Sequence, residues 1–440
     1  MKFSILTVIC LLGILLYGCR TPGITPEEPG THAPVTEGAL PPTANVSPAE
    51  EAPSSTANVS PAEKPPPSTT ILPPAEKPPP STEPATLVPV GPPAGVSGAV
   101  AKSGSATDIQ SAVNSVYRDG GGVVYIPEGD FSLNGNINIR SNITLAGAGI
   151  DKTILRTRGS STVINARGDN IRITGFSLIS TDYNGGDGIL IEDSIDFRVD
   201  HLRIEGYSSA GINVNGSSTR GVIDHSEIRM KPVSSLGYGV VVYGGEVWKD
   251  NMQLGTQYAV FIEDNTFINA RHAVAANKGA HYVFRYNLVK QGTNGQAVDA
   301  HGPYWGSDVG TRAVEIYDNV IENPGARGDE RAIGIRGGGG VIFNNTIRGY
   351  TYGVMLMMED KQDTSSYPVL HQVHDLYIWD NSYDGVSSGV IVQYENRDGK
   401  FIQEGRDYFV YPKPGYVPYT YPHPLTREDS TPPLEKVPDN

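Results

Sequence analysis

Two short strand-like patterns alternate along most of this 440-residue chain. The first is an apolar run that ends in a polar pair, and the second members of these pairs are His201, His225, Asn265, Asn287, Asn319, Asn345 and Asn381. The second pattern is a set of alternating apolar positions that begins at Ala210, Tyr238, His272, Gln296, Arg331, Tyr352 and Ser388. Interleaved strands with such variable spacing are typical of a solenoid whose coils each contain several short strands joined by loops of different lengths.

The recurring asparagine has a physical role at the corner of such a coil. Asparagine tolerates left-handed backbone at a tight turn, and its amide can hydrogen-bond the asparagine one coil away. Few hairpin turn pairs separate neighbouring runs, which argues against a β-sandwich. Together these patterns resemble the right-handed parallel β-helix proteins of the pectate-lyase-like superfamily, over roughly residues 95–410. The resemblance implies an all-β fold, a right-handed parallel β-helix (solenoid) with an N-terminal cap helix.

The cap helix corresponds to a helical pattern that follows Ser103. We expect Thr107 to be its N-cap. Its apolar face is formed by Ile109, Ala112, Val113 and Val116.

The N-terminus is typical of an exported lipoprotein. The apolar run from Phe3 to Tyr17 is short for a membrane span and stands where a secretory signal would be. Leu16-Tyr17-Gly18-Cys19 resembles a bacterial lipobox, in which Cys19 is lipidated after cleavage. We expect residues 1–18 to be a lipoprotein signal peptide and acyl chains to hold the protein at the bacterial cell envelope, at the outer membrane or the cell surface. An ordinary signal peptide or an uncleaved anchor is the alternative.

Composition divides the rest of the chain. Of the 34 prolines, 21 lie between Arg20 and Pro93, where the segment TANVSPAE recurs after 13 residues. We predict that residues 19–94 are a disordered Pro-rich repeat linker, because such a composition cannot bury enough apolar surface to fold. The proline-poor body, residues 95–410, is long enough for a large core. Residues 411–440 form a Tyr- and Pro-rich C-terminal tail.

Charge and cysteine content exclude several classes of function. The formal net charge is -14, which argues against a nucleic-acid-binding protein. Both cysteines precede residue 20, so the body has no disulfide framework and no cysteine-ligated metal. We expect the protein to be a monomer.

One face of the stack can be followed along the second pattern. Strand alternation sends every other residue outward, and neighbouring coils lie about 4.8 Å apart. One outward column reads Asn213, Val241, Ala275, Asp299, Gly334, Met355 and Ile391. The next outward column reads Asn215, Tyr243, Asn277, His301, Arg336, Met357 and Gln393. The sequence therefore predicts a row of Tyr, Asn, His and Arg beside Asp299, in a trough left by its small neighbours Ala275 and Gly334.

The local charge predicts an anionic ligand. Nine Lys and Arg residues lie between Arg271 and Arg348, against seven Asp and Glu, in an otherwise acidic protein. A positive groove attracts and holds an anion, so we expect the partner to be an acidic polysaccharide.

The residue types in this row fit β-elimination on a polysaccharide that contains uronic acids. The carboxylate must be neutralised, a base must remove the C5 proton, and an acid protonates the leaving oxygen. We assign neutralisation to Arg336 and Asn277, the base to His301 and the acid to Tyr243, while Asp299 orients the imidazole. The predicted function is that of a polysaccharide lyase.

Three other functions remain open. Asp299-Ala300-His301 is similar to the Asp-Pro-His motif of uronan C5-epimerases, which share the proton-abstraction step. A glycoside hydrolase needs clustered carboxylates, and Asp299 has no acidic partner in either column. The alternative outside the enzymes is a surface-tethered adhesin or glycan-binding β-helix. In that case His301 pairs structurally with Asp299, and Arg336 pairs with a loop acid such as Asp329 or Glu330.

Further candidates lie on loops and on a second face. Substrate-binding candidates of second rank are Arg271, His272, Arg285, Trp305 and Arg312. We see no carboxylate cluster with convincing calcium spacing and predict no metal site, although the resemblance allows Ca²⁺, since many β-helix lyases use it. The first pattern gives a third outward column, Val199, Ile223, Glu263, Arg285, Tyr317, Phe343 and Trp379. Its aromatic residues form either a platform for sugar rings or, as we favour, a surface covered by the Tyr-rich C-terminal segment.

Overall fold

The computed structural model describes residues 97–427 except 160, 184–185, 232–235, 292–295, 304–306, 326–329, 360–364, 366 and 394–399. The chain separates into two units, Met1–Pro79 and Pro80–Asn440, and the described residues belong to the second. The signal peptide, Cys19 and the Pro-rich linker lie outside the described residues.

In the described part of the chain, one α-helix precedes the coils. Helix α1 (Ala106–Arg118) buries Ile109, Val113 and Val116, as its apolar pattern predicts. The prediction of Thr107 as N-cap is wrong, because Ser105 has the extended backbone of a cap and its Oγ accepts a hydrogen bond from the Asp108 amide at 3.2 Å.

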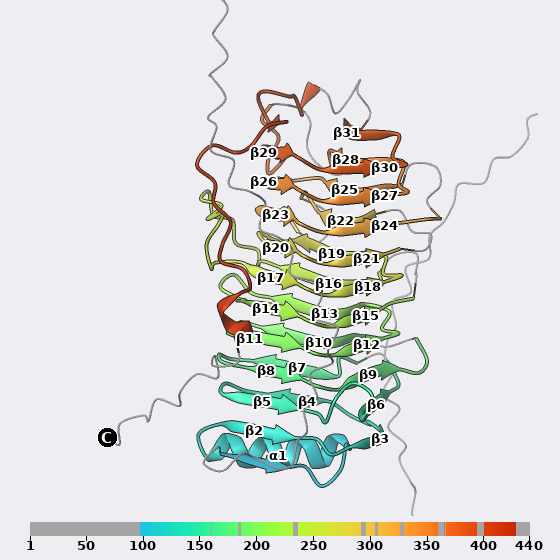
Figure 1. Ribbon diagram of the computed structural model, residues 1–440. Helices are drawn as coiled ribbons and strands as arrows, with labels where there is room; N and C mark the ends of the chain where they lie inside the picture. Colours follow the sequence, from blue (N-terminus) through green and yellow to red (C-terminus); the bar gives the residue numbers. More distant parts are fainter. Residues whose placement is uncertain are drawn as a thin grey trace, which may run out of the picture. The chain divides into compact units, whose positions relative to one another are not determined.

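Three long sheets form the walls of the coils (Figure 1). Sheet A contains β1 (Gly98–Val100), β2 (Gly122–Tyr125), β5 (Ile143–Ala146), β8 (Arg172–Thr174), β11 (Ile195–Asp200), β14 (Arg220–Asp224), β17 (Val260–Glu263), β20 (His281–Arg285), β23 (Ala313–Tyr317), β26 (Gly338–Phe343), β29 (Val373–Trp379) and β32 (Tyr408–Phe409). Sheet B contains β3 (Gly129–Ser132), β6 (Thr153–Thr157), β9 (Ser177–Ser180), β12 (Arg203–Glu205), β15 (Glu227–Arg229), β18 (Thr266–Ile268), β21 (Leu288–Lys290), β24 (Val320–Glu322), β27 (Thr346–Arg348) and β30 (Ser382–Asp384). Sheet C contains β4 (Ile137–Ile139), β7 (Ile164–Arg167), β10 (Asp187–Glu192), β13 (Ala210–Asn215), β16 (Tyr238–Tyr243), β19 (His272–Asn277), β22 (Gln296–Ala300), β25 (Arg331–Ile335), β28 (Tyr352–Leu356) and β31 (Ser388–Val392).

Each coil passes through sheets C, A and B in turn, and each strand pairs in parallel with its counterpart in the next coil. The fold is the predicted right-handed parallel β-helix. In sheet C, Val240 pairs with Val274 and Val298 pairs with Ile333, as the aligned columns predict. These inward residues are fully buried in one continuous core.

An asparagine ladder runs along the corner between sheets A and B. The Nδ2 atoms of Asn265, Asn287, Asn319 and Asn345 each donate to the Oδ1 atom of the asparagine in the next coil, at 2.9 to 3.2 Å, and the last acceptor is Asn381. The amides therefore satisfy one another and fix the coil register.

The predicted ladder is one residue out of register in its first two coils. The ladder positions there are Leu202 and Ser226, because the Leu202 amide donates to Ser226 Oγ and the Ser226 amide donates to Asn265 Oδ1. His201 and His225 instead occupy the left-handed corner, with φ of 50° and 47°. The Asp-His pairs imitate the Asp-Asn pairs in the sequence, which explains the error.

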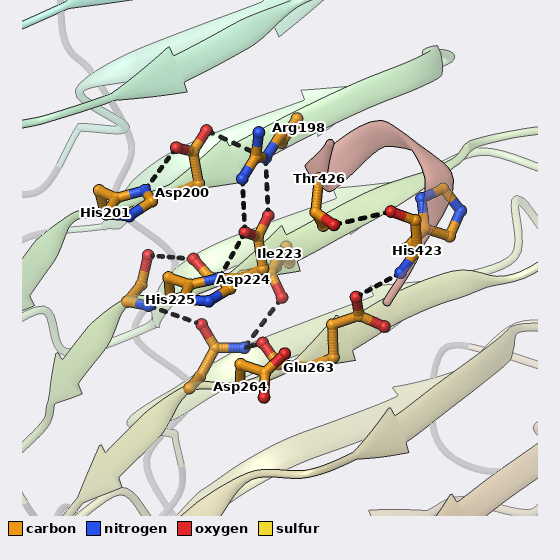
Figure 2. A network of polar contacts seen from close by, with 12 residues as sticks. Arg198, Asp200, His201, Ile223, Asp224, His225, Glu263, Asp264, His423 and Thr426 are labelled. Atoms are coloured by element: carbon orange, nitrogen blue, oxygen red, sulfur yellow. Dashed lines mark hydrogen bonds and ion pairs between the residues drawn. The ribbon is translucent and has the colours of Figure 1, made fainter. Parts of the chain in front are cut away.

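This shift changes the outward column of sheet A. Val199 and Ile223 are fully buried, and the outward positions are Asp200 and Asp224 (Figure 2). In the strand register Asp200 stands beside Asp224, and Asp224 stands beside Glu263 in the next coil. The aromatic residues at the end of the column are stacked. The ring centroid of Phe343 lies 4.7 Å from that of Tyr317 and 4.4 Å from that of Trp379.

The C-terminal segment covers this column, running beside sheet A to the 3₁₀-helix η2 (Pro424–Thr426) near β11 and β14 (Figure 1). The Tyr416 ring meets Phe343 and Trp379 edge-on. The aromatic residues therefore serve packing, as we favoured from the sequence. Within the described ranges, no helix is long and apolar enough to cross a membrane.

Candidate functional site

The predicted polar row lies on the outer face of sheet C. Tyr243 on β16 pairs with Asn277 on β19. The His301 amide donates to Ala276 O at 3.0 Å, and the Arg336 amide donates to Ala300 O at 2.8 Å. Consecutive coils therefore place the four residues in the predicted order.

Four side chains form a compact charged cluster at the centre of this row. Arg336 contacts Asp299 through Nε, 3.3 Å from Oδ1, and more closely through Nη2. Its Nη1 donates to Glu359 Oε1 at 2.9 Å. His301 joins both acids, with Nε2 2.9 Å from Asp299 Oδ2 and Nδ1 3.1 Å from Glu359 Oε2. Two carboxylates thus enclose one guanidinium and one imidazole.

Glu359 is the residue that the sequence reasoning missed. It lies outside both aligned columns, but strand alternation carried past β28 through Met355 and Met357 reaches it. Of the structural partners suggested for Arg336, Asp329 lies outside the described residues. The acids that Arg336 contacts are Asp299 and Glu359 and not Glu330, whose Oε2 accepts a hydrogen bond from Asn323.

In the described structure, the open trough predicted around Asp299 is filled by side chains. Asp299 is fully buried, because the small neighbouring residues let longer side chains fold over it. At Gly334 a Cβ atom would stand 2.4 Å from the Gln296 side chain, which fills that space. Of the four cluster residues, Arg336 and His301 have the most solvent contact, with 18% and 15% of their side chains exposed.

The charges in the cluster favour a protonated His301. Burial opposes ionisation of Asp299, but the charges of Arg336 and His301 outweigh it and hold the pKa of Asp299 well below its ordinary value. Burial also disfavours charge on His301, yet Asp299 and Glu359 raise its pKa above 6.5. An imidazolium gives the cluster two positive and two negative groups. His301 Nε2 and Arg336 Nη2, 2.8 Å apart, then both donate to Asp299 Oδ2.

His272 is buried beneath the face, so it is poorly placed for the substrate contact that we predicted. Its Nδ1 lies 2.6 Å from Gln296 O, its Nε2 lies 3.5 Å from Asp299 Oδ2, and its ring stacks on Tyr238. Burial lowers the pKa of His272 to about 4, so the ring is neutral at physiological pH. Arg271, the other candidate here, donates through Nη1 to the Tyr238 hydroxyl at 3.2 Å.

Tyr243 and Asn277 flank the cluster without entering it. Burial raises the pKa of Tyr243 to about 12, so its hydroxyl stays protonated. Asn277 Oδ1 accepts the Lys278 amide, and Lys278 Nζ stands 5.4 Å above the Tyr243 ring. In the described part of the chain neither Tyr243 nor Asn277 makes a side-chain hydrogen bond to the four cluster residues.

The remaining candidates lie elsewhere. Arg285 is fully buried on sheet A, where it pairs with Glu263 and donates to Tyr419 O and Thr420 O, so its prediction as a substrate-binding residue is wrong. Arg312 lines a separate cavity at the junction of sheets C and A. Trp305 lies outside the described residues.

The described residues offer little to a metal ion. Across the described ranges no three or more His, Cys, Asp or Glu side chains are grouped to hold one. The cluster carboxylates of Asp299 and Glu359 both face Arg336 and His301, which a Ca²⁺ ion would have to displace. This donor set does not fit Ca²⁺.

Comparison with known proteins identifies the family. Residues 97–320 match the family described as "Rhamnogalacturonase A/epimerase, pectate lyase-like", and the chain belongs to it. The matched part includes Asp299 and His301 and ends before Arg336 and Glu359. Membership gives a carbohydrate-active β-helix family and no particular reaction. No curated protein sequence matches the chain.

Several solved structures share the fold at low identity. An alginate lyase from Paenibacillus sp. str. FPU-7 is 15% identical over 66% of this chain and 97% of its own, with a TM-score of 0.38. A mannuronic-acid-specific family 6 lyase from human gut microbiota is 12% identical over 68% of this chain and 84% of its own, with a TM-score of 0.40. The catalytic unit of a GH87 α-1,3-glucanase from Streptomyces thermodiastaticus is 14% identical to this chain, with a TM-score of 0.39. The match covers 68% of this chain and 66%, just under two thirds, of that unit. At these identities and scores the likeness carries no argument about activity.

Proposed function

We propose that the protein is a polysaccharide lyase that cleaves a uronic-acid-containing polysaccharide by β-elimination on the outer face of sheet C. The observation that carries this proposal is the layering of charge in the cluster. The carboxylates of Asp299 and Glu359 are buried, and the exposed edges belong to the cations Arg336 and His301. A ligand that approaches this face meets positive charge, which favours an anionic sugar.

Arg336 has a donor left for a substrate carboxylate. A guanidinium carries five N–H groups, and the described carboxylates accept from one each on Nε, Nη1 and Nη2. One N–H on Nη1 remains for a charge-assisted contact with a uronate, whereas Nη2 also lies 2.8 Å from His301 Nε2. Such a contact withdraws charge from the carboxylate and stabilises the carbanion-like transition state.

We assign the proton transfer to His301. In its neutral form it accepts the C5 proton, the C5–H electron pair forms the C4–C5 double bond, and the C4–O bond breaks. The leaving oxygen then takes a proton, which the imidazolium can return. Tyr243 stands two coils away, about 10 Å along the stack at parallel strand spacing, so the acid role expected for it fits this geometry poorly. We assign Tyr243 and Asn277 to substrate binding.

The same layering disfavours hydrolysis. A glycosidase needs one carboxylic acid and one carboxylate in direct reach of the scissile bond. Asp299 and Glu359 do provide two carboxyl groups, but both lie beneath the cationic edge and are held in ion pairs.

A panel of uronate polymers tests the proposal. Incubation of the protein with each polymer should produce ultraviolet absorbance from unsaturated ends, and His301→Gln should abolish it. Reducing ends without absorbance would instead identify a hydrolase, and C5 inversion without cleavage an epimerase. Either result would refute the lyase assignment.

A non-catalytic glycan-binding protein is the second candidate. The observation in its favour is that His301 and Arg336 are already paired with Asp299 and Glu359. Retained binding of an acidic polysaccharide, with no change in the polymer across the panel, would establish this alternative.

We propose further that the enzyme is exported and is held at the cell envelope through lipid on Cys19. The support is the lipobox-like segment before Cys19 and the Pro-rich stretch after it. Metabolic labelling with a palmitate analogue should mark the wild-type chain, and Cys19→Ala should lose the label.

A further inference from the structure

A second cationic region lies where sheet C turns into sheet A. A cavity of about 220 Å³ opens between the loops that follow β13 and β16 and the beginnings of β14, β17 and β20. Its cationic lining residues are Arg220, Lys249 and Arg312, and His281 lies beside them. No aspartate or glutamate is among the described residues that line this cavity.

Arg312 is a buried cation without a carboxylate partner in the described structure. It is 5% exposed, and its guanidinium is held by backbone carbonyls, with Nη1 2.7 Å from Asn251 O and 3.1 Å from Met252 O. Burial lowers the pKa of Arg312, and no acid among the described residues opposes this effect. A buried charge without a counter-ion is costly, so an anion that enters the cavity would stabilise it.

The other two cations come from different loops and also retain donors. Arg220 Nε is buried and makes no hydrogen bond within the described part of the chain, and the carboxylate of Asp196 stays 3.8 Å away. Lys249 Nζ donates to Ser217 O at 3.1 Å and has two further N–H groups. Three cations therefore surround one small space, and none of the described residues that line it is acidic.

We propose that this cavity binds an anionic substituent of a glycan, either a uronate carboxylate or a sulfate ester. Arginine and lysine donors from several directions suit the oxygens of both groups. The rim adds the Tyr258 ring, which is 47% exposed and lies 5.6 Å from Arg220 Cζ. Its apolar face suits a sugar ring.

The cavity lies next to the cluster on sheet C. The Thr311 amide donates to His301 O at 2.7 Å, and Arg312 is the next residue. Tyr243 belongs both to the polar row and to the cavity wall. A chain that places one sugar at His301 and Arg336 can therefore place a charged group of another sugar in the cavity. The choice of a glycan rests on the proposed function, whereas anion binding does not.

Inorganic sulfate provides a test that is independent of the glycan. The full chain is titrated with sodium sulfate at constant ionic strength while its thermal unfolding is followed. We expect a saturable rise in Tm for the wild type, loss of the saturable part in Arg220→Met and Lys249→Met, and no change in the control Arg229→Met, an exposed arginine on sheet B. An equal rise in all four proteins would overturn the proposal.

Matched hexasaccharides distinguish the two sources of the anion. Calorimetry compares a uronate hexasaccharide, its carboxyl-reduced neutral form and the sulfated neutral form. We expect Lys249→Met to weaken the binding of one of the two anionic hexasaccharides about tenfold and to leave the binding of the neutral one unchanged. The hexasaccharide whose affinity falls identifies the substituent that the cavity binds. Equal affinities in wild type and variant for every form would refute the pocket, even if the ultraviolet assay shows lyase activity. A selective loss without any ultraviolet product would retain the pocket and refute the lyase.

Discussion

Two outward-facing carboxylate–guanidinium pairs stand on different walls of the same β-helix, and they have different surroundings. On sheet A, the Glu263 and Arg285 side chains are both 0% exposed, and the C-terminal segment completes their hydrogen bonds through Tyr419 O, Thr420 O and the His423 amide. On sheet C, Asp299 is equally buried, but its partner Arg336 keeps an exposed edge with an N–H on Nη1 to spare.

The difference shows that an ion pair alone does not mark a functional site in this fold. Both arginines are held by a buried acid, and both lie in outward columns that the sequence places on the surface. What separates them in the described structure is the cover: a returning segment of chain closes sheet A (Figure 1), whereas on sheet C the Arg336 side chain beside Asp299 remains 18% exposed. We therefore expect changes at the two pairs to separate activity from stability.

The largest effect is expected from His301→Gln. If sheet C carries the chemistry, this variant should lose about 10²- to 10⁴-fold in kcat/KM on the responsive uronate polymer, because a proton-transfer group is removed. Its free energy of unfolding should fall by less than about 2 kcal/mol, since Gln can still hydrogen-bond one of the two acids. Steady-state absorbance kinetics and urea unfolding measure the two quantities. An active variant would remove the distinction between the two walls.

The next effect is expected from Arg285→Met, which should lower the free energy of unfolding by about 3–5 kcal/mol because it leaves Glu263 buried without its partner. Activity at temperatures where the variant is folded should match the wild type. The matched control is the double variant Glu263→Leu/Arg285→Met, which removes both charges and should recover most of the loss in urea unfolding. A double variant as unstable as the single one would contradict this account.

His423 should make the C-terminal segment sensitive to acid. Burial, together with the charge of Arg285, lowers the pKa of His423 to about 4, and its Nδ1 accepts the Leu425 amide as a neutral ring does. The unfolded chain binds this proton first, near its ordinary pKa of about 6.5. Stability from His423 is therefore complete above that pH and is lost as the pH falls toward 4, by about 3 kcal/mol in total.

Urea unfolding between pH 7 and pH 4 measures this loss. The variant His423→Asn should show a flatter dependence on pH than the wild type. A control at an exposed position, Arg229→Met, should keep the wild-type slope. Parallel curves for all three proteins would assign the acid sensitivity to other groups.

The smallest effect is a displacement of the pH profile by Glu359→Gln. His301 acts as a base only when neutral, so kcat/KM should rise with pH through its raised pKa. Removal of the Glu359 charge takes away one of the contacts that raise the pKa of His301. The ascending limb of the pH–rate profile should therefore move to lower pH. An unmoved limb in the pH–rate profile would show that Glu359 does not act on His301.

The local patterns were sufficient to predict the coils and the polar row. Alternation and the recurring asparagines predicted that residues dozens of positions apart become neighbours, and His301 indeed lies against Arg336. The pattern failed at two corners where similar residue pairs occupy different positions relative to the ladder. The Asp-His pairs at His201 and His225 imitate Asp-Asn, and the error of one residue exchanged core and surface on sheet A, because side chains alternate with a period of two.

The amino-acid sequence alone determined the periodic spacing of the short strands and the Tyr-rich C-terminus, because strand periodicity and turn chemistry are local properties. Only the tertiary structure decided which polar residues are covered. Glu359 comes to the cluster from beyond the end of a strand, and Arg285 is closed off by residues more than a hundred positions later in the chain. Strand alternation continued past β28 reaches Glu359, but burial and charge pairing depend on distant contacts that alternation alone does not specify.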